Sequence, residues 1–355
     1  MIIFLYGTTA EAIKVAPVIR RLEAQGIRYE QWVTMQHTDS LAAILPVLGL
    51  PEPDRIIANG NKGRPLTSVR DVFGWLWEIR RWMRREVKKL RLELPPNTVI
   101  VVHGDTLTTV VGAWLARKLG VESAHIEAGL RSGDWRHPFP EELDRRIVGK
   151  LASIHYPPSE EAIRHLNGAR NVVPTHGNTV LDAVIDQGHA ASDSSEPFGI
   201  VLLHRFEFIS NLPLVKETVA ALAANSPVPL RLMMDAYSEG ALADAVREVG
   251  DGKFDPQPKL DHPEFIGLLK SAAFVVTDSG GIQAETALLG VPTLIHRKAT
   301  EQHEGIGENI VLSEWKVERL VDFVSHYANY RRPMSKPGVS PSDVIVGDLI
   351  ARGFA

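Results

Sequence analysis

Residues 273–289, Ala-Phe-Val-Val-Thr-Asp-Ser-Gly-Gly-Ile-Gln-Ala-Glu-Thr-Ala-Leu-Leu, join a short apolar run to a turn of small residues and an apolar helical pattern. The run Ala273 to Val276 predicts a buried parallel strand, and Gly280 to Leu289 predicts a helix. Amides in the first turn of a helix lack intrahelical partners and carry partial positive charge, so an anionic diphosphate can bind there without a lysine. The turn Ser279 to Gly281 therefore predicts a phosphate site.

A Ser-Gly-Gly turn is also common in ordinary strand-to-helix connections, and on its own it favours that plainer interpretation. Glu285 changes the balance, because it lies one turn into the predicted helix, on the same face as Gly281. A carboxylate close to a phosphate is unfavourable unless it accepts hydroxyl donors, such as those of a ribose. Glu285 is therefore predicted to contact the sugar of a nucleotide.

The same alternation of apolar runs and helical patterns extends along the whole chain. The predicted strands are Ile2–Tyr6, Tyr29–Thr34, Val99–His103, Ser123–Glu127, Gly199–His204, Leu230–Met234, Ala273–Thr277 and Thr293–His296. Alternating strands and helices indicate α/β domains with parallel sheets wound by helices on both faces. With 355 residues, two domains are expected, 1–168 and 169–334, and a last helix at about 341–355 can return to the first domain.

Composition excludes several classes of function. Hydrophobic residues make up 44% and charged residues 23% of the chain, which indicates neither disorder nor a membrane protein. The net charge of −4 argues against a general nucleic-acid binder. The sequence has no cysteine, which excludes disulfides, thiol catalysis and cysteine-ligated zinc. Because no 18-residue apolar run exists and Met1 to Tyr6 is too short for a secretory signal, a cytoplasmic protein is expected.

The helical pattern Asp71 to Arg91 combines an apolar stripe with many arginines and lysines. Such a helix can bind a membrane surface or an acidic partner. A solvated outer face on a packed helix is the preferred interpretation.

Three carboxylates lie where a parallel sheet binds ligands, beyond the carboxyl ends of its strands. Asp105 follows the strand at Val99–His103, and Glu127 ends the next one. Glu141 follows Pro138-Phe-Pro140, where a helix is predicted to start. Each acid also has a structural explanation, as a helix cap, a loop acid or a first-turn partner of the helix dipole. Clustered carboxylates shift one another's pKa, so the trio predicts an acid and a base suited to proton abstraction beside a leaving group.

Basic residues occur at comparable positions. His204 ends a predicted strand and Arg205 follows it, so a titratable donor and a fixed cation emerge together. Lys14 lies on the first helix, within reach of the same edge of the first sheet, although a surface lysine is the commoner case. No pair of histidines spaced for a metal lies beside an acid, so no metal site is predicted.

Six segments carry a family resemblance that runs from Gly7 to about Leu312. They are His103-Gly-Asp-Thr106, His125-Ile-Glu-Ala-Gly-Leu-Arg131, Pro140-Glu-Glu-Leu-Asp-Arg145, Gly177-Asn-Thr179, Pro263-Glu-Phe265 and Thr277-Asp-Ser-Gly-Gly-Ile-Gln283. In this order and spacing they resemble the non-hydrolysing UDP-N-acetylglucosamine 2-epimerases. The resemblance implies the glycosyltransferase-B architecture, in which two Rossmann-like domains face each other across a nucleotide-sugar cleft. It also implies a homodimer and no cofactor.

The family's chemistry is inversion at C2 of a UDP-N-acetylhexosamine, by elimination of UDP to a 2-acetamidoglucal and re-addition. The catalytic residues that the resemblance implies are Asp105, Glu127, Glu141 and His204. The implied substrate-binding residues are Lys14, Gln36, Arg145, Arg205, Phe265, Ser279, Gly280, Gly281 and Glu285. In this assignment Phe265 is the aromatic residue under uracil, while Lys14 and Arg145 support the sugar.

Several positions depart from the family pattern; Phe208, for example, stands where asparagine is usual, and three positions lack an arginine. Thr9, Thr38 and Gln302 stand where the family usually has arginine. Losing a charge-assisted bond to a phosphate costs about 1.5–3 kcal/mol, so weaker or altered nucleotide binding is expected. Three alternatives remain at this point: a hydrolysing epimerase that releases free N-acetylmannosamine, another glycosyltransferase-B enzyme acting on a nucleotide sugar, and a nucleotide-sugar binding protein without activity.

Overall fold

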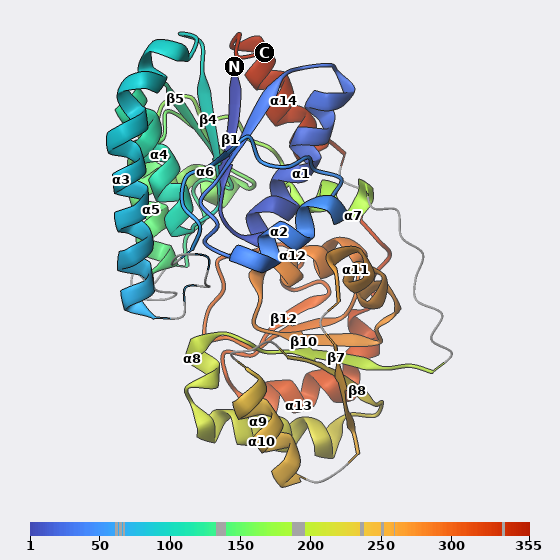
Figure 1. Cartoon of the computed structure of the whole chain (residues 1–355). Helices are drawn as coiled ribbons and strands as arrows, with labels where there is room; N and C mark the ends of the chain where they lie inside the picture. Colours follow the sequence, from blue (N-terminus) through green and yellow to red (C-terminus); the bar gives the residue numbers. More distant parts are fainter. Residues whose placement is uncertain are drawn as a thin grey trace. The chain divides into compact units, whose positions relative to one another are not determined.

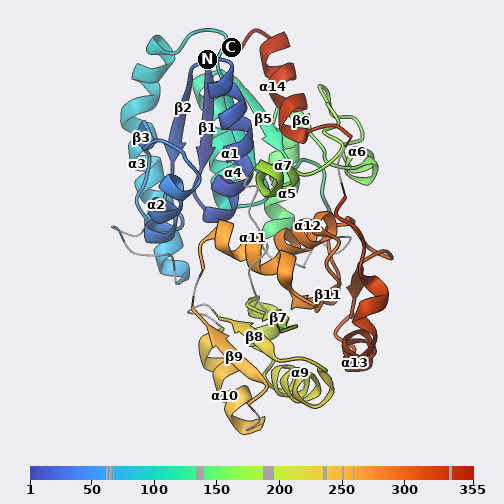
Figure 2. The ribbon, with the colours of Figure 1, turned by 90° about the vertical axis from the view of Figure 1, so that its right-hand side faces the viewer.

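The computed structural model describes residues 1–60, 63, 66, 68–132, 140–186, 196–234, 238–249, 252–258, 260–335 and 338–355. They form two compact units, traced in Figures 1 and 2. Unit 1 comprises Met1–Asp186 and Pro337–Ala355, and unit 2 comprises Gln187–Lys336. The division between the units therefore lies further along the chain than the predicted boundary at 168/169.

Unit 1 contains a parallel sheet with the strand order β3-β2-β1-β4-β5-β6. Its strands are β1 (Ile2–Tyr6), β2 (Tyr29–Val33), β3 (Arg55–Ile56), β4 (Val99–His103), β5 (Glu122–Ile126) and β6 (Ile154–Tyr156). All residues of β1 and β4 are buried, as is typical of central strands covered on both faces. The carboxyl ends of β4 and β5 are paired in register at His103 and Ile126.

Helices cover both faces of this sheet. They are α1 (Thr9–Ala24), α2 (Thr38–Val47), α3 (Val69–Glu93), α4 (Leu107–Leu119), α5 (Glu141–Leu151), α6 (Glu160–His165), α7 (Val180–Asp186) and α14 (Pro341–Ala351). Figure 1 shows α3, α4 and α5 on one side and α1, α2 and α14 on the other. The helix α14 packs against α1 and adds Ile345 and Leu349 to the core on that face.

The helix α7 explains where unit 1 ends. It packs against α1, and its Asp182 carboxylate accepts the backbone N–H of Ser342 at 2.8 Å. Arg21 on α1 also contacts Asp186 at 3.0 Å. These contacts tie the segment after residue 168 to the first sheet.

Unit 2 repeats the arrangement, with the strand order β12-β11-β10-β7-β8-β9. The strands are β7 (Gly199–Leu202), β8 (Leu230–Met233), β9 (Phe254–Gln257), β10 (Phe274–Thr277), β11 (Thr293–Ile295) and β12 (Ile310–Leu312). The helices are α8 (Phe206–Ile209), α9 (Leu212–Asn225), α10 (Glu239–Val249), α11 (His262–Ser271), α12 (Gly280–Leu289), α13 (Val317–His326) and the 3-10 helix η1 (Tyr327–Tyr330). Figure 2 shows α11 and α12 on the opposite face of this sheet from α9 and α10.

Both sheets have the strand order of the doubly wound dinucleotide-binding fold. The first three strands are added toward one edge of the sheet, and the fourth strand then pairs with the other side of the first strand. All strand pairs are parallel. The prediction of two Rossmann-like parallel sheets is confirmed. The strands β3, β6, β9 and β12 were not predicted.

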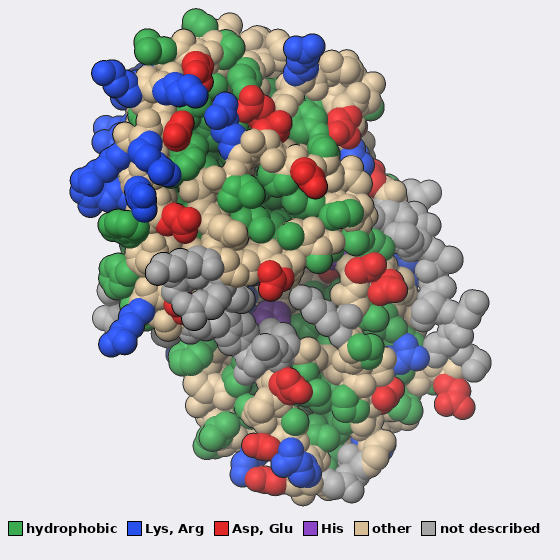
Figure 3. Space-filling model, viewed as in Figure 1, with side chains coloured by type: hydrophobic (Ala, Val, Ile, Leu, Met, Phe, Trp, Pro, Cys, Tyr) green, Lys and Arg blue, Asp and Glu red, His purple; other side chains and the backbone are tan. Residues whose placement is uncertain are grey.

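The outer face of α3 is strongly basic. Trp75, Ile79 and Met83 are buried, whereas Arg80, Arg81 and the cations that follow at the same helical spacing are exposed. Figure 3 shows lysine and arginine side chains gathered over the edge where α3 lies. Within the described ranges, no helix is both long and apolar enough to cross a bilayer.

Candidate active site

Glu127 follows β5 and occupies an unusual backbone conformation. Its φ angle is +69°, a left-handed value that costs free energy in a residue with a side chain and that often marks functional sites. The conformation is held by its backbone N–H, which donates to the carbonyl oxygen of Tyr156 on β6 at 3.1 Å. This turn directs the Glu127 carboxylate toward the backbone of Gly104, at the carboxyl end of the neighbouring strand β4.

The Glu127 carboxylate is buried and contacts Lys14. The Nζ atom of Lys14 lies 2.9 Å from Oε1 of Glu127, and the side-chain amide of Asn178 donates to the same oxygen. Burial alone would raise the pKa of Glu127, but the adjacent Lys14 charge keeps it well below the usual value. His103 lies 3.7 Å from Oε2, and burial lowers the pKa of His103 to about 3. At neutral pH the cluster therefore contains an ionised Glu127 and an uncharged imidazole.

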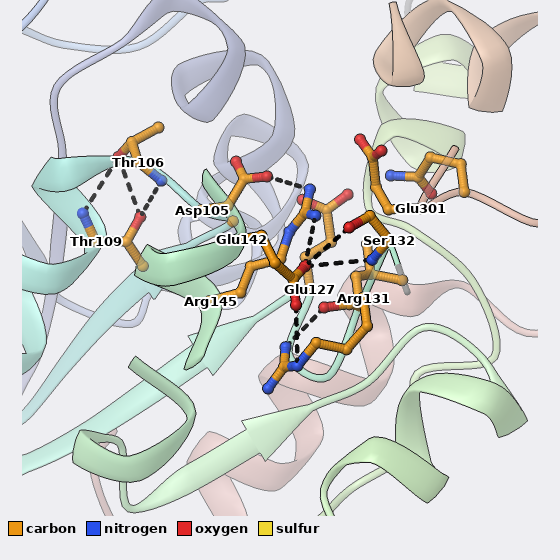
Figure 4. Close-up of polar contacts among 12 residues, drawn as sticks. Asp105, Thr106, Thr109, Glu127, Arg131, Ser132, Glu142, Arg145 and Glu301 are labelled. Carbon is orange, nitrogen blue, oxygen red and sulfur yellow. Dashed lines mark hydrogen bonds and ion pairs between the residues drawn. The ribbon is translucent and has the colours of Figure 1, made fainter. Parts of the chain in front are cut away.

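Asp105 contacts Arg145. Asp105 lies in the loop between β4 and α4, where Thr106 caps α4 by accepting the backbone N–H of Thr109. Figure 4 shows the guanidinium of Arg145, which comes from α5, paired with the Asp105 carboxylate. Arg145 also acts electrostatically on Glu127, whose pKa it helps to lower. One buried cation thus serves two of the predicted carboxylates.

Glu142 fixes this arginine. Its side chain is fully buried and lies 3.5 Å from Nη1 of Arg145 and 3.1 Å from Nε of Arg146. It also accepts the backbone N–H of Ser132 at 3.2 Å, and Arg131 lies 3.8 Å away. Figure 4 shows Arg131, Ser132 and Arg145 around the Glu142 carboxylate. Sequence analysis assigned Glu142 no role, although it follows Glu141 directly.

Asp144 was also missed. It is buried, with 4% of its surface exposed, and it lies one helical turn after Glu141 on α5. Burial, followed by the nearby charges of Asp105 and Glu141, raises the pKa of Asp144 to about 7. Since the spacing of three residues places Glu141 and Asp144 on one helix face, the sequence did contain a signal for this pair.

The other predicted residues of unit 1 lie near the same strand ends. Glu141 is the first residue of α5, and it shares with Asp105 an electrostatic effect on Asp144. Gln36 accepts the hydroxyl of Thr108, in the first turn of α4, at 2.9 Å. Unit 1 therefore holds Lys14, Gln36, Arg145 and the carboxylate trio at one edge of its sheet.

In unit 2, the turn after β10 has the form that the sequence predicted. Ser279 is the N-cap of α12, and its side chain accepts the backbone N–H of Ile282. Gly280 and Gly281 are the first two residues of the helix, so their amides have no intrahelical carbonyl to bond. A Cβ atom at Gly280 would lie 3.1 Å from the Glu301 carboxylate, so glycine lets this helix start pack closely against Glu301.

Asp278 links this turn to the residues that follow the neighbouring strand β7. Its buried carboxylate accepts the backbone N–H of His204 at 3.0 Å and that of Arg205 at 2.9 Å. The Nε atom of Arg205 donates to the Asp278 carbonyl oxygen at 3.0 Å. These bonds hold His204 and Arg205 beside the start of α12.

A second buried carboxylate, Glu301, lies between two arginines. It is 2.9 Å from Nη1 of Arg297 and 3.8 Å from Nη2 of Arg205. The start of α12 is therefore surrounded by two guanidinium groups and by amides that carry partial positive charge. This arrangement can bind a diphosphate. Arg297 was not predicted.

Glu285 is buried on the next turn of α12 and lies 2.8 Å from Nε2 of His262. His262 is the first residue of α11, and Phe265 follows on the same helix, partly buried. The helix α11 therefore brings an imidazole to the carboxylate that was predicted to contact a ribose. His262 was not predicted.

Two of the three positions where the family usually has arginine lie at helix starts in unit 1. Thr9 is the first residue of α1 and Thr38 the first of α2. Both hydroxyls are buried and have no hydrogen-bond partner among the residues that the structure describes. Gln302 is buried in unit 2, where its carbonyl accepts from Gln283 at 3.0 Å. In the described part of the chain, no three His, Asp or Glu side chains are grouped so as to hold a metal ion.

Comparisons with known proteins give one consistent family. A family model described as UDP-N-acetylglucosamine 2-epimerase matches residues 82–338. The UDP-N-acetylglucosamine 2-epimerase of Yersinia pestis is 30% identical, over 91% of this chain and 89% of that protein. The enzyme of the same name from Escherichia coli K12 is also 30% identical, over 91% and 89%. The crystal structure of Methanocaldococcus jannaschii UDP-GlcNAc 2-epimerase in complex with UDP-GlcNAc and UDP has a TM-score of 0.81 and 27% identity, covering 99% of each chain.

Proposed function

The chain belongs to the UDP-N-acetylglucosamine 2-epimerase family, and from this membership we propose that it interconverts UDP-N-acetylglucosamine and UDP-N-acetylmannosamine. The observation that carries the proposal is the buried Glu127 carboxylate, which Lys14 keeps ionised in a strained backbone turn beside the Asp105–Arg145 pair. A buried carboxylate that is ionised at neutral pH is in the protonation state that a general base needs. The relative from M. jannaschii, whose structure contains UDP-GlcNAc and UDP, supports the choice of substrate.

In the proposed reaction, a carboxylate removes the proton from C2 of the sugar while the bond between C1 and the diphosphate oxygen breaks. The electron pair of the C2–H bond forms the C1=C2 double bond of a 2-acetamidoglucal, and UDP leaves with the electron pair of the C1–O bond. UDP then adds back to C1, and a proton is delivered to the opposite face of C2. The C2 proton is weakly acidic, so a placed base and a stabilised leaving group are both needed.

We assign the sugar chemistry to unit 1. Glu127 is assigned as the base because the Lys14 ion pair keeps its carboxylate ionised at neutral pH, so that it can accept a proton. Asp105 and Glu141 are the remaining acid and base candidates, and Arg145 fixes Asp105. Lys14 and Gln36 contribute hydrogen bonds to the sugar.

We assign UDP binding to unit 2. The start of α12, formed by Ser279 to Gly281, and Arg205 receive the diphosphate, and His204 donates to it as charge develops on the leaving group. Glu285 accepts the ribose hydroxyls, and Phe265 packs against uracil. Arg297 supplies a cation near the start of α12, where the arginine expected at position 302 is absent.

Product analysis tests the activity. We expect incubation with UDP-N-acetylglucosamine, followed by proton and phosphorus NMR, to yield UDP-N-acetylmannosamine with the diphosphate intact. Accumulation of UDP with an equal amount of free N-acetylmannosamine would instead assign the hydrolysing reaction. The Glu127→Gln protein serves as the matched control for contaminating activity.

The pH dependence of kcat tests the role of the buried Asp144. Because the pKa of Asp144 is about 7, the carboxyl is protonated below that pH and ionises above it. The new negative charge beside Asp105 and Glu141 competes for Arg145, so we expect kcat to fall as the pH rises through about 7. Asp144→Asn keeps the shape of the protonated form and cannot ionise, so its kcat should match the wild type at pH 6 and lack the fall.

The control for this experiment is Asp244→Asn, a change of the same kind at an exposed position on α10. Its pH profile should follow that of the wild type. An unchanged fall of kcat near pH 7 in Asp144→Asn would remove Asp144 from the titration.

A further inference from the structure

A cavity of about 770 Å³ opens in unit 1 between α5, α6 and the segment after α6. Of the described residues that line it, none is an aspartate or glutamate, whereas six are positively charged or titratable basic residues. These are Arg131, Arg146, Lys150, His155, His165 and Arg170. The proposed epimerase chemistry uses none of these six side chains directly.

The inner wall of the cavity carries an excess of positive charge. Arg131 and Arg146, which both line the cavity, share one carboxylate, Glu142, so two positive charges face one negative charge there. Arg145 also contacts Glu142, but it is paired with Asp105 as well. Arg131 is less exposed than Arg146, with 14% of its side chain exposed. Burial lowers the pKa of Arg131; the Glu142 carboxylate opposes this effect, and the neighbouring Arg146 and Arg145 add to it. Guanidinium groups that are partly desolvated and repel one another are stabilised when an anion binds.

A second observation comes from His155 on β6. Its side chain is buried, with 2% of the residue exposed, and it lines the cavity. Its Nδ1 atom has no hydrogen-bond partner among the described residues, although buried polar atoms usually have one. A hydroxyl group or a phosphate oxygen of a ligand bound in the cavity would provide that partner.

The remaining lining residues indicate the kind of anion. Ser153, Asn167 and Asn171 add side-chain oxygens that can accept hydrogen bonds from hydroxyls, and the segment from Asn167 to Asn171 includes a left-handed Gly168. The Ser153 hydroxyl and the Asn171 amide nitrogen already donate to the carbonyl oxygens of Ser123 and Ser153. Among the described residues, no Phe, Tyr or Trp lines the cavity, so none of them offers an aromatic ring on which a nucleobase could stack. The volume is within the range of small-molecule sites.

We propose that this cavity binds a sugar phosphate, with the phosphate on the guanidinium groups and the hydroxyls on Ser153, Asn167 and Asn171. The site is separate from the residues assigned to the epimerase reaction. Arg146 and Lys150 present the phosphate contacts on α5, and Arg170 presents them from the opposite wall. The ligand proposed for this cavity differs from the nucleotide-sugar substrate, because it contains a phosphate and a sugar but no nucleoside.

Isothermal titration calorimetry of the full chain tests this site directly, with glucose 6-phosphate and inorganic phosphate as probes at constant ionic strength. The variant Lys150→Gln/Arg170→Gln removes two exposed cations of the cavity and leaves the Glu142 cluster intact. Since charge-assisted bonds to phosphate are strong, we expect its Kd for glucose 6-phosphate to be at least about tenfold higher than that of the wild type. Arg164→Gln, an exposed change on α6 outside the cavity, should bind as the wild type does.

Titrations with and without UDP separate this site from the proposed nucleotide site. Independent binding of glucose 6-phosphate in the presence of UDP supports the cavity, whether or not the protein epimerises a nucleotide sugar. Three results would overturn the proposal: no heat of binding at millimolar glucose 6-phosphate, equal affinity in the double variant and the wild type, or displacement of the probe by UDP. Stronger binding of inorganic phosphate than of glucose 6-phosphate would also overturn it, because the hydroxyl contacts would then contribute nothing.

Discussion

Glu127→Gln is expected to lower kcat about a thousandfold, within the range that a positioned general base contributes. Glutamine keeps the shape of the side chain and can still accept the Asn178 amide, but it cannot take a proton from C2. It also removes the negative charge that faces Lys14 at 2.9 Å. The measurement is kcat with UDP-N-acetylglucosamine at pH 7.5, together with a thermal melt to confirm that the variant is folded.

Glu122→Gln is the matched control for this change. Glu122 is the first residue of the same strand, β5, and its side chain is exposed. Its kcat should lie within about twofold of the wild type, because isolated surface changes have small effects. If Glu127→Gln were folded and retained more than a tenth of the wild-type kcat, Glu127 would not be the base.

Asp278→Ala is expected to destabilise unit 2 by about 3 kcal/mol or more. The Asp278 carboxylate accepts backbone N–H groups of His204 and Arg205 at 3.0 and 2.9 Å. Alanine leaves both donors without an acceptor in a buried region, and each such donor costs about 1–3 kcal/mol. The free energy of unfolding, from urea denaturation followed by circular dichroism, checks the prediction.

Asp278→Asn should destabilise the protein less than Asp278→Ala, because the asparagine amide oxygen can still accept one of the two hydrogen bonds. Its stability should lie between those of the wild type and Asp278→Ala. Asp244→Ala, at an exposed position on α10, should change the free energy of unfolding by less than about 0.5 kcal/mol. Equal stability of Asp278→Ala and the wild type would contradict the assigned role of Asp278.

The central strands could be predicted from the sequence because they are short apolar runs buried on both faces. The strands that were missed are short and lie toward the sheet edges. The strands β3, β9 and β12 are incompletely buried, whereas β6 is buried but has only three residues. The strand β3 has only two residues, and β9 contains Pro256, which cannot donate a ladder hydrogen bond. The helix α12 was predicted at its observed bounds because the Ser-Gly-Gly turn marks its start.

The site could be predicted only where the signal is local. Asp105, Glu127 and Ser279 were found because each lies at the end of a strand. The pair Lys14–Glu127 spans 113 residues of sequence, and no local pattern reports such a contact. The same holds for Arg145 and Asp105, which are 40 residues apart. The homodimer that the family resemblance implies stays a prediction.

Solvent deuterium incorporation tests the proposed function most directly. The protein is incubated with UDP-N-acetylglucosamine in D2O, and the C2 position of both epimers is followed by proton NMR. Removal and return of the C2 proton predict loss of the C2 proton signal from UDP-N-acetylmannosamine as it forms, and a rate of loss about a thousandfold lower in Glu127→Gln. UDP-N-acetylmannosamine that forms with its C2 proton retained, or a substrate left unchanged by the folded wild-type protein, would contradict the account.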